Sequence, residues 1–298
     1  MTEHKNDLRI AVRDEKHWHE LRAKNVGASE VAALFDASPY QSRFELWHRK
    51  KAAAEGAPME SSPDSQVQFM GRELEPAIAR AAAKSFGWQL INCAGQYYQH
   101  PTVDGMGCTP DALIIDPQHE SGVGLIEIKN VNYVEFKRSW LYDEPPLHYI
   151  LQLQHQLACT GLAYGYIVAL VGGNELKPYF YARDEKAIRK LCGAVSEFWQ
   201  SIREGKEPNI TAEADLEIVK AMYRPEGESE QDLTGDNELP ELIDRYLKAK
   251  ADRLALEKLE AMLQAEVIKK VGNHTFTLAK GNRISYKKIT RHNKAREA

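Results

Sequence analysis

Three ionisable side chains stand in two neighbouring apolar segments of this sequence. Glu127 and Lys129 lie in the run 122–130, and Asp111 directly precedes the run 112–115. On a β-strand, residues i and i+2 project from the same face, so the carboxylate of Glu127 and the ammonium of Lys129 share one side. If the two segments pair as a hairpin, two carboxylates and one lysine converge on one spot.

A cluster of this composition suits metal-assisted hydrolysis of a phosphodiester. Carboxylate oxygens bind Mg²⁺ while leaving positions open for water and substrate. The bound metal lowers the pKa of a water molecule and stabilises the charge that grows on the phosphate during attack. A lysine beside the metal can orient or deprotonate that water. The competing interpretation is a surface ion pair at the end of a strand, because a lone Glu-x-Lys tripeptide is common.

The hydrophobic pattern predicts the elements that would position these residues. Helical periodicity and strand-like runs alternate along the first two thirds of the chain. The order of helix, three strands, helix and strand indicates an α/β sandwich in which helices flank a mixed sheet. The expected helices are 18–22, 31–35, 44–51, 67–86, 134–141, 147–159, 185–202 and 239–271, and the expected strands are 88–98, 107–116, 122–130, 163–171, 176–182, 275–279 and 283–289.

Two positions outside the strands have local features that could serve the cluster. Ser29 is expected as the N-cap of the helix 31–35, where a hydroxyl and free N–H groups could bind an anion. Pro76 lies inside the helical stretch 67–86 and cannot donate a helical hydrogen bond, which predicts a kink or a helix start beside Glu75. The simpler alternatives are an ordinary helix cap for Ser29 and a solvated carboxylate for Glu75.

Composition argues against several classes of protein. No apolar run is long enough to span a membrane, and the polar N-terminus lacks the apolar region of a signal peptide. The four cysteines are scattered without a Cys-x-x-Cys pair, which argues against a disulfide framework, a zinc ribbon or an iron–sulfur site and predicts a reducing cytoplasm. The net charge of −4 does not by itself indicate a nucleic-acid partner.

Charge is nevertheless unevenly distributed, and this predicts the domain organisation. Residues 1–210 hold the predicted sandwich, and residues 211–238 form an acidic linker. Residues 239–298 form an extension with a long helix and a basic β-hairpin. A basic tail after an acidic linker fits a nucleic-acid partner, although the same pattern also serves solubility.

Six short motifs follow one another along the chain: Trp18–Arg22, Gly27–Val31, Gly71–Glu75, Cys108–Leu113, Leu125–Lys129 and Gln152–Leu157. Each motif is weak alone, but in order and separation the six resemble those of the YqaJ-type viral recombinases and lambda-type exonucleases of the PD-(D/E)xK nuclease superfamily. The resemblance covers roughly residues 15–205 and implies a nuclease core of the PD-(D/E)xK type.

The resemblance implies a role for each matching polar residue. Asp111 and Glu127 would bind the metal together with the backbone carbonyl of Ile128. Lys129 would activate the attacking water. The remaining matches are Glu75, whose carboxylate would reach the metal through water, Gln154, which would position the lysine, and Arg22, Ser29 and Thr109, which would bind a terminal 5′-phosphate.

The implied activity is that of an Mg²⁺-dependent 5′→3′ exonuclease, with Mn²⁺ as a substitute. It would degrade one strand of linear double-stranded DNA and leave 3′ single-stranded tails for recombination. The resemblance also implies a homo-oligomeric ring, most commonly a trimer, and a single-strand annealing protein as partner. The expected location is the cytoplasm of a bacterial host, with the gene carried by a phage or prophage and with no membrane association.

One position departs from the family pattern. Glu135 stands where lambda-type enzymes have an arginine that helps to hold the 5′-phosphate. Lys137 or Arg138 could substitute for it, so a strict need for a 5′-phosphate is left open.

Two other functions remain as alternatives. The first is an endonuclease of the same superfamily, which would cut closed circular DNA. The second is a non-catalytic protein that binds or assembles on DNA ends, against which the intact set of Asp111, Glu127 and Lys129 argues.

Overall fold

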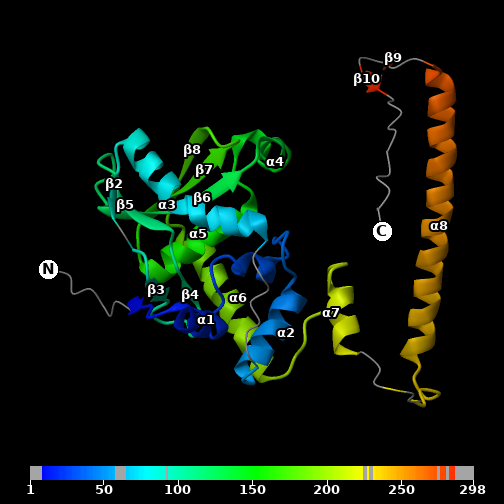
Figure 1. Cartoon of the computed structure of the whole chain (residues 1–298). Helices are drawn as coiled ribbons and strands as arrows, with labels where there is room; N and C mark the ends of the chain where they lie inside the picture. Colours follow the sequence, from blue (N-terminus) through cyan, green and yellow to red (C-terminus); the bar gives the residue numbers. More distant parts are fainter. Residues whose placement is uncertain are drawn as a thin grey trace, which may run out of the picture. The chain divides into compact units, whose positions relative to one another are not determined.

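The central sheet of the fold contains the hairpin expected from the sequence. The computed structural model describes residues 9–57, 65–91, 93–223, 227, 231–273, 276–279 and 282–285, and the chain divides into the compact units Met1–Arg224 and Pro225–Ala298. In the first unit, five strands lie in the order β2-β5-β6-β7-β8, with β6 and β7 parallel and the other neighbours antiparallel (Figure 1). The mixed sheet and the predicted hairpin, which is β5 with β6, are therefore confirmed. The strands are β2 (Gln89–Ile91), β5 (Ala112–Ile115), β6 (Val123–Val131), β7 (Tyr164–Val171) and β8 (Glu175–Ala182).

Helices and a second, smaller sheet complete this unit. The small sheet has the order β1-β3-β4. Its strands are β1 (Arg9–Ala11), β3 (Gln96–Gln99) and β4 (Gly107–Cys108). The helices are α1 (Glu15–Ala23), η1 (Val31–Phe35), α2 (Arg43–Ala54), α3 (Gln66–Phe86), α4 (Tyr133–Ser139), η2 (Leu141–Asp143), α5 (Leu147–Thr160), α6 (Glu185–Arg203) and α7 (Asp215–Met222).

The two faces of the central sheet are covered by different helices, as Figure 1 shows for α3 and α5. Ile126 and Ile128 of β6 belong to the apolar cluster that includes α3. Leu125 and Val131 belong to the cluster that includes α5. Because side chains alternate along a strand, Glu127 and Lys129 share the α5 face with Leu125 and Val131. The alternation of β6 thus decides which helix supplies the neighbours of the catalytic candidates.

Two of the predicted strands are each divided between the two sheets. The run 88–98 separates into β2 and β3 at a turn where Gly95 has a positive φ of 75°, a conformation that glycine adopts without steric cost. The run 107–116 separates into β4 and β5 at Pro110, which has no N–H to contribute to a ladder. Asp111 lies in this second break, directly before β5.

The helix α3 corrects the expectation attached to Pro76. The helix begins at Gln66, where Ser65 forms a capping box with Gln68, and it continues through Pro76 without a break. Pro76 lies on the exposed side of the helix, while Ile78, Ala79, Ala82 and Ala83 are buried. We attribute the continuity to this packing, which offsets the cost of a proline in a helix interior, about 3 kcal/mol.

The end of the first unit also differs from the predicted domain limit. The segment expected to be an acidic linker contains α7, which contacts α2. Asp215 is fully buried and accepts hydrogen bonds from the hydroxyl of Ser42 and from the backbone N–H groups of Thr211 and Ala212. The compact unit therefore extends to Arg224, beyond residue 210.

We expect a chain truncated after Ile210 to be less stable than a chain truncated after Arg224. The shorter form loses Asp215, whose hydrogen bonds should contribute about 1–3 kcal/mol because both partners are partly or wholly buried. Thermal unfolding should show a lower Tm for the shorter form, by roughly 2–10 °C. Equal Tm values for the two truncations would show that α7 adds nothing to the core.

The second unit consists of a long helix and a short hairpin. The helix α8 (Glu238–Val271) has many exposed apolar side chains, including Leu242, Tyr246 and Leu263. The strands β9 (Phe276–Ala279) and β10 (Asn282–Ser285) pair antiparallel, as predicted, and their connection at 280–281 and the chain after 285 lie outside the described residues. Among the described helices, none is both long enough and apolar enough to cross a bilayer.

Candidate active site

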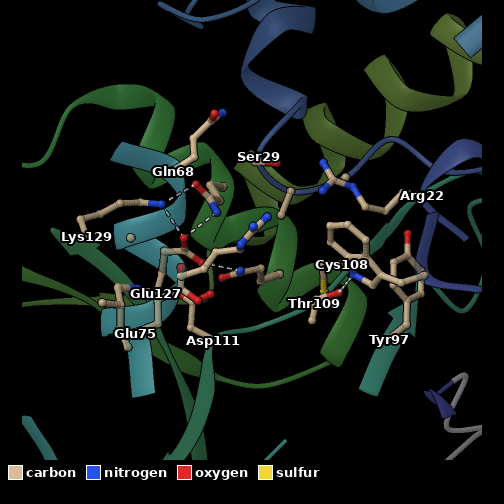
Figure 2. Close-up of a pocket in the computed structure, with 18 of the residues that line it drawn as sticks. Arg22, Ser29, Gln68, Glu75, Tyr97, Cys108, Thr109, Asp111, Glu127 and Lys129 are labelled. Atoms are coloured by element: carbon tan, nitrogen blue, oxygen red, sulfur yellow. Dashed lines mark hydrogen bonds and ion pairs between the residues drawn. The ribbon is translucent and has the colours of Figure 1, made fainter. Parts of the chain in front are cut away.

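A cavity of about 550 Å³ brings most of the predicted site residues together. Figure 2 shows the carboxylates and Lys129 on one side of this cavity and Arg22, Ser29 and Thr109 on the other. The walls come from α1, α3, α5, β4, β6 and the loop that contains Ser29. The predicted site residues that line it are Arg22, Ser29, Glu75, Thr109, Asp111, Glu127, Ile128 and Lys129.

The hairpin holds the central residues in direct contact. A carboxylate oxygen of Asp111 accepts a hydrogen bond from the backbone N–H of Ile128 at 2.7 Å. The Nζ atom of Lys129 lies 2.6 Å from Oε1 of Glu127, which is almost completely buried. Asp111 and Glu127 thus reach the same place because β5 and β6 pair antiparallel in the predicted way.

Two glutamines of α5 complete the environment of the lysine and Glu127. The Oε1 atom of Gln152 accepts from Lys129 at 3.2 Å, and its Nε2 donates to Glu127 at 2.6 Å. Gln156 donates to the other carboxylate oxygen of Glu127 at 2.6 Å. Gln152 and Gln156 lie one helical turn apart and therefore share a face.

The assignment of the lysine-positioning role to Gln154 was wrong. Its Nε2 donates to the carbonyl of Ala182 at 2.8 Å, and its Oε1 accepts from the backbone N–H of Asp184 at 2.9 Å. Residues two apart on a helix point in nearly opposite directions, so Gln154 cannot face Lys129 when Gln152 does. The i, i+4 spacing of Gln152 and Gln156 puts both on one helical face, but the sequence does not show that this face, and not the face of Gln154, meets Lys129.

Separate substitutions of Gln152 and Gln154 should distinguish a residue that positions Lys129 from one that only stabilises the fold. We expect Gln152→Ala to lower the rate of DNA hydrolysis about tenfold to a hundredfold, because Lys129 and Glu127 each lose a hydrogen bond. Gln154→Ala, the matched control, should lower Tm while retaining most of the rate. The measurements are initial rates on linear duplex DNA and thermal unfolding, and the opposite pattern would restore Gln154 to the site.

The electrostatics of the site reflect several carboxylates around one lysine. Burial raises the pKa of Asp111 well above its ordinary value, and the charges of Glu127 and Glu75 raise it further. Burial and the charge of Glu127 raise the pKa of Glu75 to about 6. Burial opposes the charged form of Lys129, but Glu127 and Asp111 raise its pKa overall. Ionisation of all three carboxylates therefore costs free energy beside a single lysine, and a bound cation would reduce that cost.

The donor set fits a hard divalent cation. Asp111 and Glu127 offer carboxylate oxygens, and Ile128, whose N–H donates to Asp111, also lines the cavity. Within the described part of the chain, no three side chains of the Asp, Glu, His or Cys type form a ready cluster for a metal ion. Mg²⁺ commonly binds through one or two carboxylates and retains several waters, so a set of this size is sufficient.

The other side of the cavity is rich in hydrogen-bond donors. The guanidinium of Arg22 lies over the ring of Trp18, with 4.5 Å from Cζ to the ring centroid. The indole N–H of Trp18 donates to the hydroxyl of Thr109 at 3.3 Å. Ser29 is exposed to the cavity, but the N-cap position of the 3₁₀ helix η1 belongs to Glu30 and not to Ser29. The predicted capping role of Ser29 is therefore wrong, while its position in the pocket stands.

A buried cluster of charged side chains forms ion pairs next to Arg22. Glu30 lies 2.8 Å from Nζ of the fully buried Lys50 and 2.6 Å from Arg49, and Arg22 is 3.8 Å away. Burial by itself would raise the pKa of Glu30, but Lys50, Arg49 and Arg22 lower it to about 2. Lys50 also donates to the backbone carbonyls of Arg22 and Asn25, each at 2.7 Å. Nothing in the local sequence around Glu30 or Lys50 indicates that the two residues form a buried ion pair.

The basic residues considered as substitutes at position 135 do not reach the cavity. Glu135 of α4 forms an ion pair with Arg138 on the surface. Lys137 lies over the ring of Tyr133, 5.4 Å from its centroid. None of these three charged residues belongs to the cavity wall.

Comparisons with known proteins show which proteins this chain is similar to. Residues 17–163 match the model of the YqaJ-like viral recombinase domain. The chain is 26% identical over 260 residues to the uncharacterized protein YqaJ of Bacillus subtilis (strain 168), covering 86% of this chain and 77% of that protein. The alkaline exonuclease LHK-Exo of Laribacter hongkongensis has a similar structure, with 25% identity, a TM-score of 0.53 and coverage of 69% of this chain and 96% of that one. A second structure of LHK-Exo, in complex with dAMP, gives 26% identity, the same TM-score and the same coverage.

Proposed function

We propose that this chain is a metal-dependent 5′→3′ exonuclease acting on linear double-stranded DNA, because residues 17–163 match the YqaJ-like viral recombinase domain and the alkaline exonuclease LHK-Exo has a similar structure. The observation that carries this proposal is one cavity with two parts. Asp111, Glu127 and Lys129 form the first part, and the donor-rich wall around Arg22 forms the second. The first part suits hydrolysis, and the second suits the phosphate at a DNA terminus.

In the proposed reaction, Asp111 and Glu127 would hold Mg²⁺, with Mn²⁺ as a substitute, and the backbone carbonyl of Ile128 would complete the protein ligands. When bound, the metal lowers the pKa of a coordinated water and stabilises charge on the phosphate. Lys129 orients the attacking water through Nζ, and Gln152 keeps that atom in place. Glu75, which also lines the cavity, can accept a proton from a water molecule there.

The second part of the cavity would select which end of the DNA strand binds. Arg22, Ser29 and Thr109 can donate hydrogen bonds to the oxygens of a terminal 5′-phosphate. With the end held there, the next phosphodiester along the strand would reach Lys129 and the carboxylates, and removal of nucleotides from the 5′ end would leave a 3′ single-stranded tail. The structure of the similar protein LHK-Exo in complex with dAMP supports a nucleoside monophosphate as the product. The annealing partner and the ring-shaped oligomer stay predictions.

The test is digestion of a linear duplex labelled at either the 5′ or the 3′ end of one strand. With Mg²⁺ we expect the 5′ label to be released first as a mononucleotide, while EDTA should stop release and a closed circular duplex should stay intact. Release of the 3′ label first would reverse the polarity. Cutting of the circle would indicate an endonuclease, and binding of ends without release would indicate a non-catalytic DNA-end protein.

A further inference from the structure

A fully buried lysine anchors the end of the helix that carries Arg22. Lys50 of α2 has no exposed surface, and its Nζ atom donates to the backbone carbonyls of Arg22 and Asn25, each at 2.7 Å. The carboxylate of Glu30 lies 2.8 Å from the same atom. An ammonium group has three N–H donors, and these three contacts use all of them. Lys50 therefore caps the C-terminal end of α1 from a neighbouring helix.

The carboxylate partner of this lysine contacts both the side chain of Arg22 and the backbone that follows α1. Oε1 of Glu30 accepts from Arg49 at 2.6 Å and lies 3.8 Å from Arg22. Oε2 accepts from the backbone N–H of Gly27 at 2.7 Å. The guanidinium of Arg22 also lies over the ring of Trp18. Contacts with a carboxylate and with an aromatic ring therefore restrict this guanidinium.

The Glu30–Lys50 pair lies next to the cavity without belonging to its wall. Arg22, Gly27 and Ser29 line the cavity, as Figure 2 shows for Arg22 and Ser29. Neither Glu30 nor Lys50 lines it, and both are almost completely buried. The pair thus has no surface with which to contact a bound DNA end. Any effect that it has on binding must pass through the residues that it contacts.

Fold stability alone does not require a charged pair at this place. Replacement of a buried ion pair by apolar residues of similar volume is often neutral or stabilising, because the two charges no longer have to be removed from water. The charged pair supplies two directed contacts: a carboxylate beside the guanidinium of Arg22, and an ammonium on two backbone carbonyls. Apolar side chains supply neither contact.

We propose that the Glu30–Lys50 pair positions Arg22 for the terminal phosphate and thereby sets the preference of the cavity for a phosphorylated 5′ end. The inference rests on the proposed function, because it concerns the phosphate-binding part of the same cavity. Glu30 and Lys50 are positioning residues, and Arg22 is the group that would contact the phosphate. Without the pair, the guanidinium has to be ordered when DNA binds, and that ordering lowers the affinity.

The test combines Glu30→Gln with Lys50→Met in the full chain, in a Lys129→Ala background so that bound ends are not degraded. The double substitution removes one negative and one positive charge, so the net charge beside Arg22 is unchanged and only the contacts are lost. Dissociation constants are measured for duplexes that carry either a 5′-phosphate or a 5′-hydroxyl. We expect the preference for the phosphorylated end, which is the ratio of the two constants, to fall about tenfold.

Asp215→Asn is the matched control for lost stability. Asp215 is also fully buried, and it accepts a hydrogen bond from Ser42, the N-cap residue of the same helix α2, but it does not line the cavity. This variant should have a lower Tm and keep the parental preference for the phosphorylated end. If the double variant does not fold, Lys50→Met alone is measured in its place, because it leaves Glu30 paired with Arg49, and the same loss of preference is expected.

A double-mutant cycle tests whether the effect passes through Arg22. In an Arg22→Ala background, the substitutions of Glu30 and Lys50 should change the preference by less than about twofold, because the group that they position is absent. A full loss of about tenfold on top of that of Arg22→Ala would show that the pair acts on other groups, and it would overturn the positioning role.

Other results would overturn the proposal in distinguishable ways. If the parent prefers the phosphorylated end, Arg22→Ala loses this preference and the double variant retains it, the phosphate-binding part of the cavity stands and the Glu30–Lys50 pair has only a structural role. If the parent binds both ends equally, the assignment of this part of the cavity in the proposed function fails, and the positioning role fails with it.

Discussion

Lys129→Ala is expected to reduce the rate of DNA hydrolysis by about 10²–10⁴-fold while retaining the binding of DNA ends. The physical reason is that Nζ of Lys129 is the cation placed against Glu127 and Gln152, where it can orient the attacking water. Its ring contact with Tyr149, 4.8 Å from Nζ to the centroid, further restricts the side chain. Single-turnover rates and end-binding affinities, measured on the same linear duplex, separate the two effects.

Lys84→Ala is the matched control for this substitution. Lys84 is an exposed lysine in the last turn of α3, outside the cavity wall, so its loss removes the same charge without touching the site. The control should hydrolyse DNA at the parental rate. If Lys129→Ala degrades DNA as fast as the control, the lysine is not part of the reaction and the site assignment fails.

Asp111→Asn is expected to abolish most of the activity and at the same time to stabilise the metal-free protein. Asparagine keeps an oxygen that can accept from the N–H of Ile128, so the hairpin contact survives. It removes a buried carboxyl group whose pKa is raised by burial and by the charges of Glu127 and Glu75. Losing a metal-binding carboxylate should cost at least about 10³-fold in rate, while Tm without metal rises by a few °C, roughly 1 kcal/mol.

The response to Mg²⁺ distinguishes a metal site from a purely structural carboxylate. The parental protein should gain Tm as Mg²⁺ is added, since a ligand that binds only the folded state stabilises it, and Asp111→Asn should lose most of this gain. Asp104→Asn, an exposed position outside the cavity, should behave as the parent does. A parental protein whose activity is unchanged in EDTA would contradict the metal mechanism outright.

The hairpin and its cluster could be predicted because they depend on local rules. The i, i+2 spacing of Glu127 and Lys129 puts both on one face of any strand, and Asp111 directly precedes the nearest earlier strand. The residues that were missed depend on long-range packing. Gln152, Gln156 and Gln154 have the same chemistry and lie on the same helix, so only the rotation of α5 against β6 selects among them.

The hydrophobic pattern of the sequence also predicted only part of the secondary structure around the site. The runs 88–98 and 107–116 each have a strand-like composition, yet each is shared between two sheets because partner strands, and not composition, decide where pairing stops. The helix through Pro76 is the reverse case, in which a local signal for a break is overruled by buried contacts along α3.

By itself, the sequence determined which reactive residues come together: two carboxylates and a lysine on a hairpin, within an α/β sandwich. That much follows from residue types and periodicity, which act over a few positions. Tertiary structure alone decided the surroundings of these residues: the glutamines that hold Lys129, and the buried Glu30 and Lys50 beside Arg22. These depend on distances between segments far apart in the chain, and burial sets their energies, so no local pattern encodes them.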